Sequence, residues 1–155
     1  MPLEYANSEL VARAYVKSLG ITGCNTTLPQ NPANWGGDTF VVLSVTGANI
    51  HPEFRLRMPV ITAECFATKL ANPKPDGVTT QSPDWAKACD LAEKIVMGCY
   101  DDFVPVDIAL GVTGAPAARI YNVGLIGEPR RVPDDQSGYA KYTVDFQIKW
   151  AQLTN

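Results

Sequence analysis

The sequence has few of the residues and motifs that most catalytic and metal sites require. His51 is the single histidine, with only Glu53 as a nearby carboxylate, whereas zinc sites combine several His, Cys or carboxylate ligands at short spacing. The GxSxG, GxxxxGK[ST] and GxGxxG patterns of nucleophile elbows and phosphate-binding loops are also missing. We therefore expect no enzyme activity, no cofactor and no metal site.

Long apolar runs and paired cysteines are missing as well. No run approaches the ~20 apolar residues that cross a bilayer, and the start, MPLEYANSEL, lacks the basic and apolar regions of a signal peptide. Cys24, Cys65, Cys89 and Cys99 form no CxxC pair. We expect them to be small apolar side chains in a reducing compartment, in a chain that does not associate with membranes.

Charge and size set further limits. The 155 residues correspond to one ordinary domain, residues 1–155. Hydrophobic residues make up 46% and charged residues 19%, which indicates a folded chain. The net charge is −3 and the longest basic run is Arg130-Arg131, so the footprint of a nucleic-acid-binding domain is absent.

Hydrophobic periodicity predicts two helices. The first begins at Asn7 or Ser8 and ends near Leu19, before Gly20, a residue that suits a helix C-terminus. The second is predicted to open with Ser82 as its cap and to end at about Cys99. Side chains at helical spacing along it are Trp85, Cys89, Ala92, Val96 and Cys99.

Four strands are predicted, with a fifth short one left open. They cover residues 40–46, 57–67, 118–126 and 139–150, and residues 107–111 can form a short strand. Residues 21–38 and 72–83 are rich in Pro, Gly and polar residues and read as loops, the second either mobile or a contact arm. This order predicts an α+β fold: a two-layer domain in which a mainly antiparallel sheet of about four strands packs against two helices.

The last strand has the clearest pattern in the sequence. Its apolar set is Ala140, Tyr142, Val144, Phe146, Ile148 and Trp150, and its polar set is Lys141, Thr143, Asp145, Gln147 and Lys149. Such alternation predicts one buried and one solvated face. At ~40 Å in length, the strand must cross the whole domain or project beyond it.

The loop before this strand concentrates charge. It contains Arg130 and Arg131 followed by Asp134 and Asp135, the latter pair close to Gly138 and suited to turn formation. The arginines can pair with these aspartates inside the loop or with a neighbouring subunit. The sequence leaves both alternatives open.

This C-terminal segment resembles a known family. The residues that carry the resemblance are Gly127, Pro129, Arg130, Arg131, Pro133, Asp134, Gly138, Lys141, Tyr142 and the alternation to Trp150. Together they are similar to the C-terminal signature of tail-terminator (tail-completion) proteins of long, non-contractile-tailed bacteriophages, the siphophages. The order of the remaining elements fits the same layout.

The resemblance implies a structural virion protein: a ring, typically hexameric, that caps the head-proximal end of the tail tube. Such a ring terminates tube polymerisation and joins the tail to the head. The implied partners are further copies of the chain, the major tail tube protein and the head–tail connector protein. Viral DNA would pass the lumen without specific binding, in keeping with the mild negative charge.

The implied location is the tail or neck of the virion, after assembly in the cytoplasm of the host bacterium. Another head–tail connector, neck or tail-tube-related protein of the same virion is the alternative, ahead of a small ligand-binding module or enzyme. Candidate subunit or partner contacts are Arg130, Arg131, Asp134, Asp135, Lys141 and Lys149. A long final strand can also extend a sheet into the next subunit.

Overall fold

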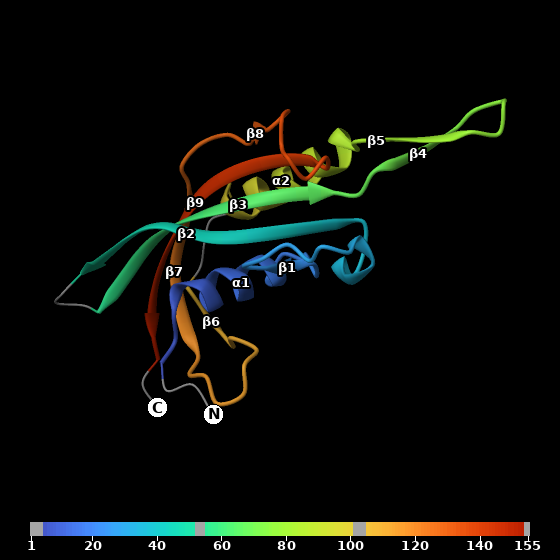
Figure 1. Cartoon of the computed structure of the whole chain (residues 1–155). Helices are drawn as coiled ribbons and strands as arrows, with labels where there is room; N and C mark the ends of the chain where they lie inside the picture. The colour runs from blue at the N-terminus through green and yellow to red at the C-terminus, as the bar shows by residue number, and fades with distance from the viewer. Residues whose placement is uncertain (1–4, 52–54, 101–104, 154–155) are drawn as a thin grey trace.

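Figure 1 shows a strongly curled sheet with helices packed against it and a thin ribbon that projects from one end. The computed structural model describes residues 5–51, 55–100 and 105–153. In chain order the elements are α1 (Ser8–Ser18), β1 (Cys24–Asn25), the 3-10 helix η1 (Pro32–Trp35), β2 (Thr39–His51), β3 (Leu56–Ala67), β4 (Leu70–Pro73), β5 (Thr79–Ser82), α2 (Trp85–Tyr100), β6 (Val106–Ile108), β7 (Ala118–Leu125), β8 (Arg130–Arg131) and β9 (Ala140–Gln152).

The main sheet is larger and more curved than the sequence predicted. Its strands follow the order β1-β2-β3-β9-β7-β6, and β8 pairs with β9 as the seventh strand. β1 runs parallel to β2 while the other neighbours are antiparallel, so the sheet is mixed. The predicted two-layer domain with a four-stranded sheet is therefore wrong. The chain instead forms a curled half-barrel of mostly sheet, with two α-helices in its described residues.

The error has a physical cause. β1, β6 and β8 are two or three residues long, and hydrophobic periodicity needs longer segments to produce a signal. These short strands form because long strands elsewhere in the sequence offer free edges to them. They extend the sheet beyond the four long strands β2, β3, β7 and β9.

The C-terminal strand β9 lies at the centre of the sheet. β3 pairs with one of its edges, from Ala67↔Ala140 to Arg57↔Trp150, and β7 followed by β8 pairs with the other. The prediction of a strand that crosses the domain with one buried face is confirmed, since the side chains of that face from Val144 on, Val144, Phe146, Ile148 and Trp150, are at most 1% exposed. Because both edges are already paired within the chain, β9 does not extend the sheet into a neighbour.

Helix α1 forms as predicted. The Asn7 side chain accepts a hydrogen bond from the Leu10 amide at 2.9 Å, which satisfies one of the free amides at the helix start. Gly20 follows the helix with a φ of 86°, where the absence of a Cβ removes the strain of the left-handed region. The helix buries Val11, Ala12, Tyr15 and Val16.

Helix α2 has the predicted extent but a different cap. Asp84, not Ser82, accepts a hydrogen bond from the Lys87 amide at 3.1 Å, and Ser82 is the last residue of β5. The buried face consists of Ala88, Leu91, Ala92, Ile95 and Val96. Cys89 and Cys99, which the sequence assigned to that face, are half-buried at its margins.

Both helices share one core with the inward face of the sheet. Tyr15 of α1 lies 5.9 Å from Phe146 of β9, measured between ring centroids. The helices also approach each other closely, because a Cβ at Gly98 of α2 would lie only 2.8 Å from a methyl carbon of Leu19. The core thus depends on side chains from both ends of the chain.

A second apolar cluster lies at one end of the sheet around Trp35. The indole is 1% exposed, packs 5.0 Å from the Tyr139 ring and 6.1 Å from the Phe40 ring, and donates a hydrogen bond to the Pro29 carbonyl at 3.0 Å. Trp35 thus forms a local apolar cluster with Phe40 and Phe66.

Residues 72–83 are not an irregular loop. Most of them belong to the β4–β5 ribbon, which pairs from Leu70↔Ser82 to Pro73↔Thr79 and projects from the domain. The short strand suggested by residues 107–111 is present as β6, slightly earlier in the chain.

We predict that Gly23→Ala destabilises the fold by about 1–3 kcal/mol, the usual cost of forcing atoms into a packed site. A Cβ at Gly23 would lie 2.7 Å from the backbone carbonyl oxygens of Trp35 and Thr39, which have little freedom to move. The matched control is Gly37→Ala in the same segment, where a Cβ meets nothing within 4 Å. Urea unfolding monitored by circular dichroism measures both, and equal midpoints would contradict the prediction.

Candidate interaction surface

The charged loop and β9 form the candidate surface, and β8 fixes its geometry. Arg130 pairs with Thr143 and Arg131 with Tyr142. Since consecutive residues of a strand point to opposite sides of a sheet, the two arginines lie on different faces.

Arg131 lies on the helix side. Its guanidinium carbon stands 3.8 Å from the centroid of the Trp85 ring, at the start of α2. The Tyr142 ring meets the same indole edge-on, with centroids 6.3 Å apart. This cation–π stack attaches β8 to α2.

Arg130 lies on the polar side. Its guanidinium donates to a carboxylate oxygen of Asp145 at 3.3 Å, and the Thr62 hydroxyl donates to the other oxygen at 2.6 Å. The Arg130 side chain remains 68% exposed and the Asp145 side chain 27% exposed. Arg130 is therefore accessible to a partner while its carboxylate partner is held in place.

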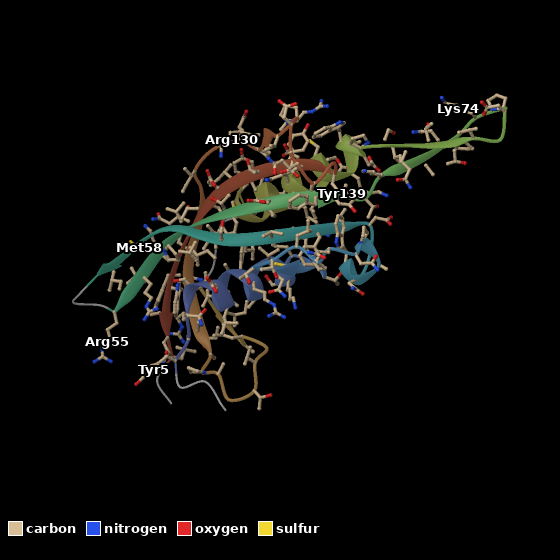
Figure 2. All side chains as sticks on the ribbon, in the orientation of Figure 1. Tyr5, Arg55, Met58, Lys74, Arg130 and Tyr139 are labelled. Carbon is tan, nitrogen blue, oxygen red and sulfur yellow. The ribbon has the colours of Figure 1, made fainter. Side chains whose placement is uncertain are left out.

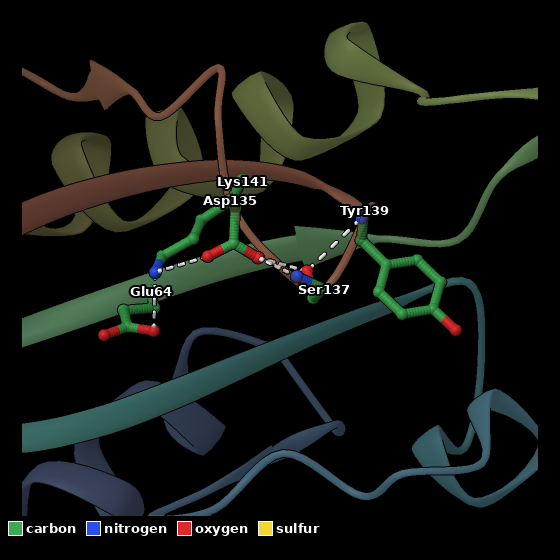
Figure 3. Close-up of polar contacts among 5 residues, drawn as sticks. All are labelled: Glu64, Asp135, Ser137, Tyr139 and Lys141. Carbon is green, nitrogen blue, oxygen red and sulfur yellow. Dashed lines mark hydrogen bonds and ion pairs between the residues drawn. The ribbon is translucent and has the colours of Figure 1, made fainter.

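Lys141 connects the loop to the sheet, as Figure 3 shows. Its ammonium lies 3.1 Å from a carboxylate oxygen of Glu64 on β3 and 3.2 Å from one of Asp135. Asp135 also accepts hydrogen bonds from the amide and the hydroxyl of Ser137, and the same hydroxyl accepts one from the Tyr139 amide. The loop is thus closed by an internal network.

The pKa values reflect this network. Burial lowers the pKa of Lys141, but hydrogen bonds to Glu64 and Asp135 outweigh it and the net shift is upward. Burial raises the pKa of Asp135, but hydrogen bonds from Ser137 and Lys141 outweigh it and the net shift is downward. Both groups are therefore charged at neutral pH.

The other two candidate residues lie apart from this network. Asp134 is exposed in the loop, and Lys149 is half-buried on β9 opposite Asn122. The structure brings Lys141 together with Asp135 and gives Arg130 and Arg131 the partners Asp145 and Trp85. The pairing of the arginines with Asp134 and Asp135 is not what the structure shows.

Sequence reasoning missed three residues of this surface: Glu64, Trp85 and Asp145. Asp145 and Lys141 both belong to the polar set of the last strand, so the sequence alternation already predicts that they lie on the same face. Glu64 and Trp85 come from distant segments, and only the pairing of β3 with β9 and the position of α2 bring them here.

A surface hollow lies beside Arg130. It has a volume of about 550 Å³ and is lined by Ile126, Gly127, Glu128, Pro129, Arg130 and Asp145. Ile126 is 54% exposed, so an apolar side chain adjoins an arginine and a glutamate. Arginine is enriched at protein–protein interfaces, so the hollow is a candidate contact site.

The described residues offer no metal site, since no group of three or more His, Cys, Asp or Glu side chains gathers among them. His51 ends β2, and its side chain lies outside what the structure describes. Burial raises the pKa of the Cys24 and Cys99 thiols to about 11 and raises that of Cys65 further. These thiols are therefore protonated at neutral pH and weak nucleophiles.

Neither α1 nor α2, the helices that the structure describes, has the length and hydrophobicity to span a bilayer. Comparison with protein families, curated proteins and solved structures finds no family model, protein or structure that matches the chain.

We predict that Arg131→Ala costs about 0.5–1 kcal/mol of stability, the usual value of an exposed cation–π contact. It should also change the fluorescence of Trp85, the half-buried indole under the guanidinium. Arg130→Ala is the matched control and should leave the emission unchanged, because Arg130 lies on the other face. Equal emission changes in the two variants would contradict the assignment of faces.

We predict that Asp135→Asn lowers stability at neutral pH and flattens its decline in acid. Despite partial burial, hydrogen bonds from Ser137 and Lys141 hold the pKa of Asp135 in the fold below its ordinary value of 3.8. Its contribution is therefore complete above that value and is lost as pH falls through the folded pKa. Urea midpoints across this range measure the effect. Asp134→Asn is the control. If the urea midpoint of Asp135→Asn depends on pH in the same way as that of the wild type, the Asp135 contacts with Lys141 and Ser137 do not stabilise the fold.

Proposed function

We propose that the protein is a tail terminator of a long, non-contractile phage tail. It assembles as a ring that caps the head-proximal end of the tail tube, stops tube polymerisation and presents the surface to which the head is joined. The observation that carries this proposal is the C-terminal segment 127–150, with its Gly-x-Pro-Arg-Arg-x-Pro-Asp loop and alternating strand.

The geometry of that segment supports an assembly role. Its strand half is buried at the centre of the sheet, and its loop half displays Arg130 beside a hollow with the exposed Ile126. Arg130 has one intramolecular carboxylate partner and most of its surface free. Such a group can add a contact to a neighbouring protein without unfolding its own loop.

The shape of the chain also supports a ring. The β2–β3 hairpin and the β4–β5 ribbon project at opposite ends of the sheet, and Figure 2 places Arg55 at the first and Lys74 at the second. Two unlike projections allow a head-to-tail contact, in which one end of a copy meets a different surface of the next. Head-to-tail contacts that close produce rings.

Electrostatics are compatible with a DNA passage. On the polar face Lys141 is neutralised by Glu64 and Asp135, and Arg130 by Asp145. With a net charge of −3, a ring of this chain has little attraction for the phosphate backbone.

We predict that deleting the gene from the phage genome yields tails of uncontrolled length that do not join heads. Complementation with the wild-type chain should restore infectious particles. Complementation with the Arg130→Gln variant should reduce the yield of infectious particles about tenfold or more, because the loss of an Arg130 contact with a partner worth about 1.4 kcal/mol weakens binding tenfold. Lys94→Gln, a matched loss of an exposed positive charge on α2, is the control. Electron microscopy of the particles is the readout.

Each result of this experiment separates the candidates. Tails of normal length on a deletion background would reject the terminator. Normal-length tails that remain unjoined to heads would instead favour a connector or neck protein of the same virion.

A further inference from the structure

The β4–β5 ribbon forms a separate two-stranded sheet that, in the described part of the chain, does not pair with the main sheet. All four residues of β4 are exposed, and Leu70 and Val78 are 46% and 55% exposed. In Figure 1 the ribbon extends well away from the rest of the sheet. An isolated two-stranded hairpin is only marginally stable in water, so a ribbon of this kind gains stability when another surface covers it.

The ribbon is nevertheless built as a defined element. The Lys74 amide donates to the Val78 carbonyl at 2.9 Å, and the Gly77 amide donates to the Lys74 carbonyl at 3.0 Å. Asp76 accepts from the Val78 amide at 3.0 Å, and Gly77 has a φ of 83° that favours glycine. At the base of the ribbon the Asn72 side-chain amide donates to the Ser82 hydroxyl at 2.8 Å.

The two edges of the ribbon differ in what they can bind. β4 ends in Pro73, which has no amide hydrogen and blocks further strand pairing at that point. β5 is Thr-Thr-Gln-Ser, with two β-branched residues and no proline. β5 is therefore the edge on which a further strand can pair.

A strand edge of matching length is present on the same chain. β6 is the last strand of the main sheet, three residues long, and within the described residues it pairs only with β7. Val106 is 45% exposed. The Arg119 side chain donates two hydrogen bonds to Asp107, at 2.6 and 3.1 Å, which fix β6 in place.

The positions and charges of the ribbon and of β6 favour contact between copies. The ribbon and β6 lie at different extremities of the molecule in Figure 1, so one chain cannot bring them together. Within the ribbon, residues 70–82, the charges of Lys74 and Asp76 balance, whereas the chain as a whole has a net charge of −3. The neutral ribbon can therefore approach another copy without the repulsion that two negative surfaces would experience.

We propose that the β4–β5 ribbon is an assembly arm that docks on a second copy of this chain, with its β5 edge adding to the β6 edge of that copy. The contact is head-to-tail and therefore repeats from one copy to the next. The inference rests on the proposed function in one respect only: the successive head-to-tail contacts close into a ring.

The register of the ribbon permits a clean test. Because Leu70 and Ser82 are paired, residues 71–81 can be replaced by Asn-Gly, which closes a two-residue hairpin turn. The hydrogen bonds described above join residues of the ribbon to one another and not to the main sheet. The chain with the shortened arm should therefore have a thermal unfolding midpoint close to that of the full chain. Sedimentation equilibrium over a dilution series measures self-association of both.

We predict that the full chain associates and that the arm-shortened chain associates at least about tenfold more weakly. Equal association of the two, or a full chain that stays monomeric throughout the series, overturns the proposal. As a second measurement, Thr80→Cys with Val106→Cys should give disulfide-linked ladders under mild oxidation. Thr80→Cys with Lys94→Cys is the control, and ladders of equal yield there would also overturn it.

The outcome is separable from that of the proposed function. Arm-dependent association in a protein whose deletion leaves tails normal would reject the terminator and keep the arm. A terminator phenotype fully restored by an arm-shortened chain that still associates would keep the function and reject the arm.

Discussion

The pairing of β9 on both of its edges is the constraint on which the rest of the structure depends. Phe146 illustrates it, since this one residue faces Ile61 of β3 and Leu125 of β7 in the two ladders. Its side chain is fully buried and packs on Tyr15 of α1. Strand β9 thus joins the β2–β3 hairpin, the β6–β7 hairpin and the first helix into one body, and a shift of register by one residue would expose its apolar set.

The same register determines which charged groups meet. Lys141, Asp145 and Lys149 lie on the outward face because Phe146, Ile148 and Trp150 occupy the inward one. β8 follows this register, so Arg130 joins the outward set and Arg131 the inward set. The charged loop is therefore two contacts of different kinds. One is a stack that holds β8 on α2, and the other is an exposed arginine held by a carboxylate.

The sequence predicted those parts of the fold that depend on local pattern. The alternation from 140 to 150, the Asn7 cap and the apolar face of α2 all involve residues close in sequence, and each is present. The curl, the strands β1 and β8 and the pairing of Glu64 with Lys141 depend on contacts between distant segments, which period and propensity do not encode. The α2 cap shows a smaller limit, because Ser82 and Asp84 are equally good capping residues and strand pairing in the ribbon decides between them.

The central position of β9 also restricts how copies of this chain can associate. A long strand at a sheet edge is a template for open-ended pairing and aggregation. Of the three longest strands, β3 and β9 lie inside the sheet, whereas β2 is covered on its outer edge by β1 only at Val41 and Val42. The terminal strands β1 and β6 are two and three residues long, which limits strand addition to a few hydrogen bonds. The proposed association at β6 therefore has to draw on side-chain contacts as well, and side chains are exposed at the ribbon and at the Arg130 hollow. In the proposed ring, the short edges act together with specific side-chain contacts, and head-to-tail contacts of this kind close when each copy meets the next in the same geometry.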